Sequence, residues 1–292
     1  MTIPNIPRIV LGSMTFGLDT TDPVASACKV HGVSAVTPFV ETFTSYGHTE
    51  VDTARFYGNG DCEIVLAQLA PEITAHIKIA TKVFPFKAGS HNKENLPKQF
   101  RESLAEALMH SICKQNNYVL PTVYQGSYNP IDRSVVSELL LCLKHLNMSF
   151  YAYNPISGGV LSGKYKFGVE VPEGSRYDPK TYIGKMVREM YWNKITFEAI
   201  DSLTKAATAH NLTLLEATLR WMRHHSGLTS KDAILIGSSK VEQLEETLRE
   251  LEKGPLPKEM IKAFDEAWEH VKPIARSYFF AENDVLPSPK RE

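Results

Sequence analysis

Two short apolar runs of this chain each end in an ionisable residue, and they lie about one strand–helix unit apart. The first ends at Asp52 and is followed by Tyr57, and the second, Ile77–Val83, carries Lys82. A spacing of about thirty residues is typical of a β-α-β unit, in which the two strands are parallel. Because the carboxyl ends of such strands meet at one edge of a sheet, we expect these three side chains to lie close together. A nearby ammonium stabilises a phenolate, so the arrangement predicts that Tyr57 acts as a proton donor.

Strand-like and helical patterns alternate along the chain, which favours an α/β fold with a parallel sheet. A barrel is the leading interpretation, because polar residues follow the apolar strands at their carboxyl ends, where barrel active sites lie. A doubly wound sheet is the alternative, but no G-x-G-x-x-G follows the first strand. We expect strands at Arg8–Leu11, Glu50–Thr53, Ile77–Val83, Thr122–Gln125, Phe150–Tyr153 and Ala233–Ile236, and helices at Val36–Tyr46, Cys62–Ala70, Leu96–Asn116, Asp132–His145, Trp192–Ala209, Leu214–His225 and Val241–Lys253.

The spacing of these elements is irregular in one place. Between Lys82 and Gln125, where the next clear strand ends, the chain has room for one helix and little more. A complete barrel has eight strands and averages roughly thirty residues per unit. The sequence therefore predicts one domain, residues 1–292, derived from a (β/α)8 TIM barrel but incomplete, with about six strands. The loop Gly163–Lys185 is long enough to cover a site.

Composition excludes several classes of function. A net charge of −1 without a basic block gives no reason to expect nucleic acid or an anionic membrane as a partner. The longest apolar stretches are only as long as strands, and Met1–Leu11 lacks the pattern of a secretory signal, so we expect a cytoplasmic protein. The cysteines show no metal-ligand spacing and read as reduced thiols; they are Cys28, Cys62, Cys113 and Cys142. No metal is predicted.

Several segments in the same order resemble the aldo-keto reductases, and among these the aflatoxin-aldehyde-reductase branch. The segments are Ile9–Met14, Glu50–Gly58, Ala80–Lys82, Leu120–Gly126, Tyr151–Lys164 and Ile234–Leu244. The resemblance implies NADP(H) as cofactor and a small carbonyl compound as substrate. It also implies that Tyr57 donates a proton to the carbonyl oxygen as hydride arrives, that Lys82 lowers the pKa of Tyr57, and that Asp52 holds Lys82 in place and charged.

The same resemblance implies where the cofactor binds. Gln125 matches the amide that bonds the nicotinamide carboxamide, and Tyr153 matches the aromatic residue that stacks on the nicotinamide ring. The glycine-rich segment that follows Tyr153 matches the pyrophosphate loop, and a turn that opens a late helix suits the 2′-phosphate of NADP. The residues implied, with Asp52, Gln125 and Tyr153, are Asn154, Pro155, Ile156, Ser157, Gly158, Gly159, Val160, Leu161, Ser162, Gly163, Lys164, Gly237, Ser238, Ser239, Lys240, Gln243 and Glu246.

The chain departs from the family pattern in three places. Gln243 stands near a position where many members carry Arg, and Thr247 stands where many carry Asn, so preference for NADP over NAD is left open. The family's catalytic His and its Ser-Asn pair have no counterpart, which indicates an internal deletion near residues 108–110. His110 is no substitute, because it lies inside a predicted helix whereas barrel chemistry lies at strand ends. Losing a polar group positioned at a developing oxyanion often costs ~10²–10³ in rate.

The sequence therefore predicts NADPH-dependent reduction of an aldehyde or ketone to an alcohol, and the resemblance favours a tailoring step in secondary metabolism. Trp192, Tyr191, Met190 and Phe56 could line an apolar substrate pocket, while residues at such spacing are more often core. The alternative is a catalytically impaired protein of the same fold that binds a nucleotide or a partner. A third interpretation is a mis-spliced product, which a longer transcript would reveal. The oligomeric state is open and includes a homodimer.

Overall fold

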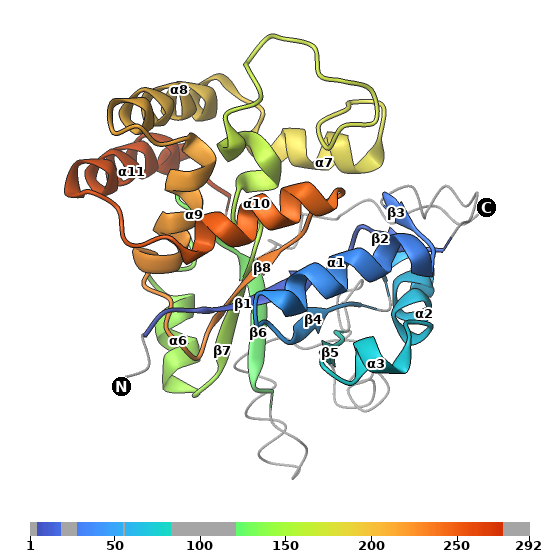
Figure 1. Ribbon diagram of the computed structural model, residues 1–292. Coiled ribbons are helices and arrows are strands. Elements are labelled where there is room, and N and C mark those ends of the chain that lie inside the picture. The colour runs from blue at the N-terminus through green and yellow to red at the C-terminus, as the bar shows by residue number, and fades with distance from the viewer. Residues whose placement is uncertain (1–4, 19–27, 55, 83–120, 277–292) are drawn as a thin grey trace, which may run out of the picture.

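The central feature of the protein is a six-stranded parallel sheet (Figure 1). The computed structural model describes residues 5–18, 28–54, 56–82 and 121–276. In these ranges the strand order is β5-β4-β1-β8-β7-β6. The strands are β1 (Arg8–Gly12), β4 (Glu50–Asp52), β5 (Lys78–Ala80), β6 (Val123–Ser127), β7 (Ser149–Tyr153) and β8 (Ala233–Ile236). Each predicted strand is present, and the prediction of an incomplete barrel is confirmed.

The strands alternate between two faces, as the pleat requires. One face packs under the helices in the main core, to which Ile9, Leu11, Val51, Phe150 and Ile234 belong. The other face carries a small separate apolar cluster, which consists of Val10, Tyr151, Ala233 and Leu235. The main hydrophobic core therefore lies between the sheet and its helices, as in a barrel wall.

Hydrogen bonds between side chains on the inner face show that the sheet curls. Arg8 donates to Tyr151 Oη at 2.8 Å and to Glu50 Oε2 at 2.8 Å, and Tyr151 donates to Glu50 Oε1 at 2.6 Å. These residues come from β1, β7 and β4, and in the strand order β8 separates β1 from β7. Only a strongly curved sheet brings them together, so the inner face is the interior of a half-barrel.

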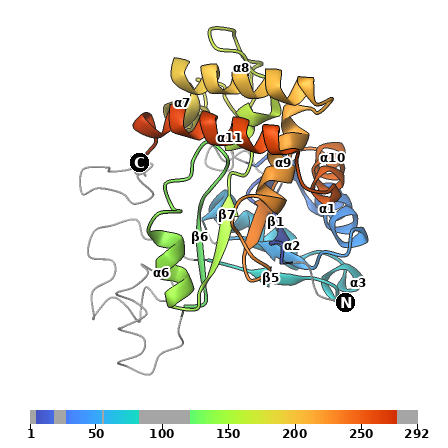
Figure 2. The same ribbon diagram turned by 90° about the vertical axis from the view of Figure 1, so that its left-hand side faces the viewer.

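Helices surround the outer face of the sheet (Figures 1 and 2). Helices α1 and α10 lie side by side, and so do α8 and α11. No helix in the described ranges is long and apolar enough to cross a membrane. The described helices are α1 (Val33–Ser45), α2 (Asp61–Ala67), α3 (Pro71–Thr74), α6 (Leu139–His145), α7 (Tyr182–Tyr191), α8 (Lys194–Ala209), α9 (Leu214–His224), α10 (Val241–Glu252) and α11 (Lys258–Val271), with 3₁₀ turns η2 (Tyr57–Gly60), η3 (Ser157–Ser162) and η4 (Lys272–Ile274) and a small sheet of β2 (Phe16–Gly17) and β3 (Val30–His31).

Four helices differ from the prediction. Helix α7 begins within the last residues of the segment expected to be loop, and neither the short helix α3 nor α11 was expected. Helix α6 begins at Leu139 instead of Asp132, because Asn129 and Asp132 pair across a tight turn and the chain continues in turns up to the helix. The predicted helix Leu96–Asn116 and the deletion near residues 108–110 lie outside the described residues.

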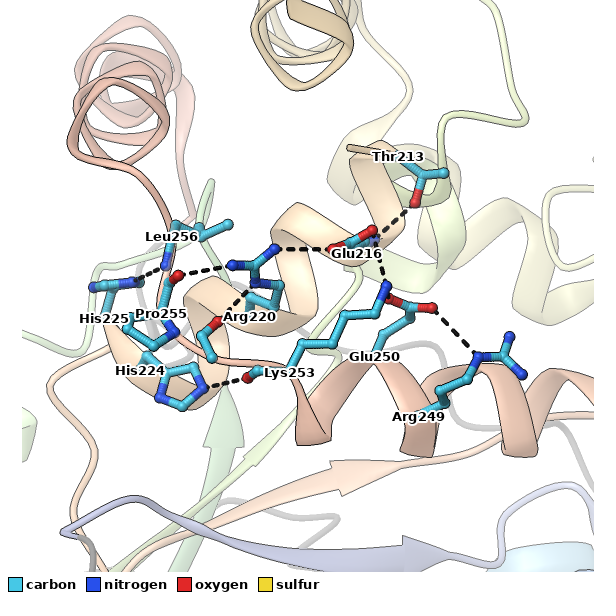
Figure 3. Close-up of polar contacts among 11 residues, drawn as sticks. Thr213, Glu216, Arg220, His224, His225, Arg249, Glu250, Lys253, Pro255 and Leu256 are labelled. Carbon is cyan, nitrogen blue, oxygen red and sulfur yellow. Dashed lines mark hydrogen bonds and ion pairs between the residues drawn. The ribbon is translucent and has the colours of Figure 1, made fainter. Parts of the chain in front are cut away.

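A polar network fixes α10 against α9 and the segment that follows α10 (Figure 3). Glu216 accepts a hydrogen bond from Arg220 Nη1 at 2.9 Å and pairs with Lys253 Nζ at 3.1 Å. Lys253 also pairs with Glu250 at 2.5 Å, and Arg220 donates to the carbonyl of Pro255 at 2.7 Å. The network lies toward the carboxyl end of α10 and holds this helix in place. The amino end of α10 follows a turn that contains Ser238, Ser239 and Lys240.

Candidate active site

Asp52 and Lys82 form a part-buried ion pair at the carboxyl ends of β4 and β5. Lys82 Nζ lies 2.6 Å from Asp52 Oδ2, and the side chains of Lys82 and Asp52 are 28% and 5% exposed. Lys82 also donates to the carbonyl of Thr53 at 3.0 Å. Backbone and side chain of Ser13 both donate to the Asp52 carbonyl, at 3.0 and 2.7 Å. The ammonium is thus held by two acceptors on the strand next to its own.

Tyr57 begins the turn η2, directly after β4. Its backbone N–H donates to the carbonyl of Ala54 at 3.0 Å, which closes the turn. The following residues, Gly58 and Asn59, have φ values of 54° and 56°, a left-handed conformation that glycine and asparagine adopt more readily than other residues. The turn carries Tyr57 back over the strand end, so Lys82 Nζ lies 4.5 Å from the centre of the Tyr57 ring. The structure therefore brings together the three residues predicted to be catalytic.

The protonation equilibria of these residues reflect their burial. Burial raises the pKa of Asp52 and lowers the pKa of Lys82, while each partner's charge acts in the opposite direction. Burial and the Asp52 carboxylate raise the pKa of Tyr57 well above its ordinary value. Lys82 lies over the face of the Tyr57 ring, and the expectation that Lys82 lowers the pKa of Tyr57 stays a prediction.

Arg176 is a candidate site residue that the sequence did not predict. Its guanidinium lowers the pKa of Tyr57, against the effect of burial. Its Nε atom is buried and has no hydrogen-bond partner in the described part of the chain. The only sequence feature that points to Arg176 is its position in the long loop after residue 163. A single Arg in such a loop has no pattern that separates it from an ordinary surface Arg. A cation near the hydroxyl end of Tyr57 can stabilise either a phenolate or a bound anion.

Gln125 lies on β6 and Tyr153 on β7, the two strands at the opposite end of the sheet order from β4 and β5. Gln125 Nε2 donates to Asp52 Oδ1 at 2.8 Å, so the amide joins the ion pair directly. Tyr153 ends β7 and leaves 40% of its surface exposed. An exposed aromatic ring at the carboxyl end of a barrel strand could stack on a planar group. The structure places both predicted cofactor residues on the face of the strand ends that carries Asp52.

The loop after β7, Asn154–Lys164, adopts backbone conformations that are uncommon outside functional turns. Asn154 and Ser157 have φ values of 61° and 51°, and Gly158 and Gly159 have φ values of 66° and 111°. The Ser157 hydroxyl is buried and has no hydrogen-bond partner among the described residues, although Tyr177 Oη donates to the Ser157 carbonyl at 2.7 Å. A strained glycine-rich turn with an unpaired hydroxyl fits a loop that receives a phosphate group.

The turn Gly237–Lys240 joins β8 to α10. The amino cap of α10 is Lys240, whose side chain makes no capping hydrogen bond, so the first N–H groups of the helix have no side-chain acceptor there. The hydroxyl of Ser238 is buried without a partner in the described ranges, while Ser239, Lys240 and Gln243 are exposed. Glu246 lies one turn further along the helix and is half-buried. Unpaired donors, a helix amino end and a lysine together suit a phosphate.

Aromatic side chains pack beside the glycine-rich loop. Trp192 contacts Tyr165 and Tyr177 with ring centroids 5.9 and 5.1 Å apart. Arg188 lies over the Trp192 ring at 4.2 Å and donates to the Tyr177 carbonyl at 2.6 Å. Arg188 and Trp192 therefore hold the segment that carries Arg176. Within the described ranges, no group of three or more His, Cys, Asp and Glu side chains could hold a metal ion.

Comparison with known proteins gives the same family that the motifs suggested. The pattern of the Aldo/keto reductase family matches residues 8–109 and 105–269. An aldo-keto reductase of Pseudocercospora fijiensis is 35% identical, over 82% of this chain and 99% of its own length. Human aflatoxin B1 aldehyde reductase member 2 is 32% identical, over 96% of this chain and 92% of its own length. The alignment with the human protein spans 349 positions, more than the 292 residues of this chain.

Solved structures resemble this fold as well. A glycerol dehydrogenase of Gluconobacter oxydans superposes with a TM-score of 0.61 at 17% identity, covering 94% of this chain and 96% of that protein. At this identity the likeness concerns the fold alone, and it agrees with a barrel-derived sheet.

Proposed function

Because the chain belongs to the aldo/keto reductase family, we propose that Tyr57, Lys82 and Asp52 carry the acid–base part of an NADPH-dependent carbonyl reduction. The reaction converts an aldehyde or ketone to an alcohol. The observation that carries the proposal is the contact of the Asp52–Lys82 ion pair with the Tyr57 ring. When bound, NADPH supplies the hydride.

The three residues have distinct roles. Tyr57 holds a proton on Oη at neutral pH, because burial raises its pKa, and delivers that proton to the carbonyl oxygen of the substrate. Lys82 keeps a positive charge against the phenol ring and so stabilises the phenolate that is left. Asp52 keeps Lys82 charged and fixes its position. Arg176 adds a second positive charge near Tyr57.

The residues at the strand ends and in the two turns would hold the cofactor. Tyr153 would stack on the nicotinamide ring, and the amide of Gln125 would bond its carboxamide. The loop Asn154–Lys164 would bind the pyrophosphate, and Gly237, Ser238, Ser239 and Lys240, with Gln243 and Glu246, would bind the adenosine end. Support comes from buried polar atoms that lack partners in the described ranges, namely Ser157 Oγ, Ser238 Oγ and Arg176 Nε. A phosphate-rich ligand would supply acceptors to all of them.

We further propose that the chain is one domain from which an internal unit of the barrel is deleted near residues 108–110. The two matched stretches of the family pattern overlap at residues 105–109, which supports a join at this point. The deleted unit would have carried the family's catalytic His and Ser-Asn pair. Reduction without the His remains possible because Tyr57 is the proton donor, at a cost of ~10²–10³ in rate.

The substrate is a carbonyl compound, and we propose that the exposed Phe56 contacts a neutral aldehyde or ketone bulkier than a small acid. The rings around Trp192 pack against one another and against the core. We propose a cytoplasmic protein that performs a tailoring reduction in secondary metabolism. A homodimer is compatible with the proposal and is tested by light scattering.

The test is a titration of the full-length chain with NADPH, followed by Trp fluorescence, and then turnover with a panel of aldehydes and ketones. Saturable binding and NADPH-dependent reduction are expected. Tyr57→Phe should bind NADPH as the wild type does and lose ~10²–10⁴ in turnover, whereas the matched phenol removal Tyr46→Phe should change neither. Retained turnover in Tyr57→Phe would exclude Tyr57 as the proton donor. A folded chain that fails to bind NADPH would contradict the reductase proposal, and binding without turnover would favour a nucleotide-binding protein.

A further inference from the structure

Gln125 makes a contact that joins distant strands of the sheet. It lies on β6, the last strand in the sheet order, and its Nε2 atom is 2.8 Å from Oδ1 of Asp52 on β4. Three strands, β1, β8 and β7, separate β4 from β6 in that order. The hydrogen bond therefore crosses the mouth of the half-barrel instead of following a neighbouring pair of strands.

The chemistry of the two groups fixes the orientation of the amide. An ionised carboxylate only accepts hydrogen bonds, so the nitrogen of Gln125 faces Asp52 and the amide oxygen points elsewhere. Asp52 then has a donor on each oxygen, Gln125 on Oδ1 and Lys82 on Oδ2. Two donors on opposite oxygens fix the rotation of the carboxylate, and with it the position of Lys82 over the ring of Tyr57.

Burial makes this second donor important. The Asp52 side chain is 5% exposed, and burial and the Glu50 carboxylate both raise its pKa. Lys82 and Gln125 act in the opposite direction and favour the charged form. The other ionisable groups whose equilibria are coupled to this pair are Tyr57 and Cys62, and Cys62 supports the charge of Lys82. Without Gln125, Oδ1 would have no donor among the described residues.

We propose that Gln125 is a positioning residue for the Asp52–Lys82 pair, in addition to its contact with the carboxamide of the cofactor. The nitrogen of the amide holds Asp52, and its oxygen is available to a carboxamide N–H. The role rests on the proposed reductase function for its catalytic consequence, but the contact with Asp52 exists in the protein without cofactor. It can therefore be tested without turnover.

The experiment measures the ionisation of Asp52 by ¹³C NMR in the full-length chain labelled at aspartate carboxyl carbons, without cofactor. The Asp52 resonance is assigned by its absence in Asp52→Asn. Gln125→Met keeps the length of the side chain and removes the donor, and the midpoint of the Asp52 titration should rise by about one pH unit. The matched control is Val123→Ala, two residues earlier on the same exposed edge strand, which should leave the midpoint unchanged.

A midpoint that is the same in Gln125→Met and wild type would overturn the proposal and leave Gln125 as a cofactor ligand only. An equal rise in Val123→Ala would also overturn it, because loosening of the strand would then explain the effect. If Gln125→Met does not fold, Gln125→Asn, one methylene shorter, should give the same rise. In active enzyme, the acid limb of the kcat profile should move by the same amount. Absence of turnover in the wild type would refute the reductase function and still leave the NMR result decisive.

Discussion

The ion pair of Asp52 and Lys82 should reduce the stability of the fold that contains it. Burial raises the pKa of Asp52 and lowers the pKa of Lys82, so folding makes the charged form of each group less favourable than it is in the unfolded chain. We therefore predict that the double variant Asp52→Asn/Lys82→Met is as stable as the wild type or more so, although each single variant is less stable. The asparagine side chain that replaces Asp52 can still accept the hydrogen bond from Gln125 through its amide oxygen.

The magnitudes follow from what each variant leaves behind. Asp52→Asn leaves a cation with the Thr53 carbonyl and 28% exposure, so it should cost about 3 kcal/mol, the lower end for a broken buried pair. Lys82→Met leaves the Asp52 carboxylate unpaired, and this carboxylate can take up a proton. Protonation costs about 1.4 kcal/mol for each unit by which the solution pH exceeds the pKa of Asp52. The double variant leaves no charge at either position. Its free energy of unfolding should be within about 1 kcal/mol of the wild-type value, or higher.

The pH dependence of Lys82→Met has a definite sign. A carboxyl whose pKa is raised in the folded state binds its proton more tightly there than in the unfolded chain, so its contribution to stability is lost as the pH rises. The deficit of Lys82→Met should therefore be largest above the raised pKa of Asp52 and should shrink as the pH falls toward about 3.9. Asp52→Asn/Lys82→Met should lack this pH dependence.

Urea unfolding followed by circular dichroism measures all four proteins across pH. The expected result is a coupling free energy of about 3 kcal/mol or more between the two sites, with the m-values unchanged. Additive losses in the double variant would refute the reasoning, because they would mean that each charge contributes stability by itself. Turnover should be lost in the double variant, and retained turnover would show that the pair is not part of the chemistry.

Two further predictions concern the turn before α10 and the network in Figure 3. Ser238→Ala should weaken NADPH binding roughly tenfold without loss of stability, because the buried Ser238 hydroxyl has no partner in the described ranges of the unliganded chain. Ser202→Ala on α8 is the matched control. An unchanged dissociation constant of NADPH in Ser238→Ala would remove Ser238 from the phosphate site. His225 Nε2 accepts a hydrogen bond from the Leu256 N–H at 2.9 Å, and burial lowers the pKa of His225, so stability should fall as the pH drops below about 6.5. His225→Gln should flatten this part of the urea-unfolding profile, and an identical slope would contradict the assignment.

The strands could be predicted from the sequence because each is a short apolar run with polar residues at its end. Parallel β-α-β connections also place successive strands side by side, which accounts for the neighbours β1, β4 and β5 and for the neighbours β6, β7 and β8. The pairing of β1 with β8 is the closure expected of a barrel. Helices α7 and α11 were harder to predict from the sequence. Helix α7 carries Lys, Arg and Glu among its apolar residues and follows a loop rich in Gly and Pro. In the described part of the chain, no strand follows α11 to mark it as part of a repeating unit.

The candidate site also has a part that the sequence predicts and a part that it does not. Asp52 ends β4, Tyr57 follows β4 and Lys82 follows β5, so the parallel sheet alone predicts that the three residues meet. The Gln125–Asp52 contact was unpredictable because it depends on how far an incomplete sheet curls, and no local pattern records that curvature. The two proposed roles of Gln125 need different atoms of one amide, and a motif match identifies the residue but not the atom.

Arg176 shows a further limit of sequence patterns and bears on whether the site can work. It lies in an irregular loop, which the contacts of Tyr177, Arg188 and Trp192 and the hydrogen bond from Tyr177 to the Ser157 carbonyl hold beside the loop after β7. A reductase must stabilise negative charge on the carbonyl oxygen while Tyr57 gives up its proton. The cations that the described site offers for this purpose are Lys82, which is already bonded to Asp52, and Arg176, whose Nε has no partner. Catalysis without the family's His would therefore depend on Arg176 more than the sequence alone suggested.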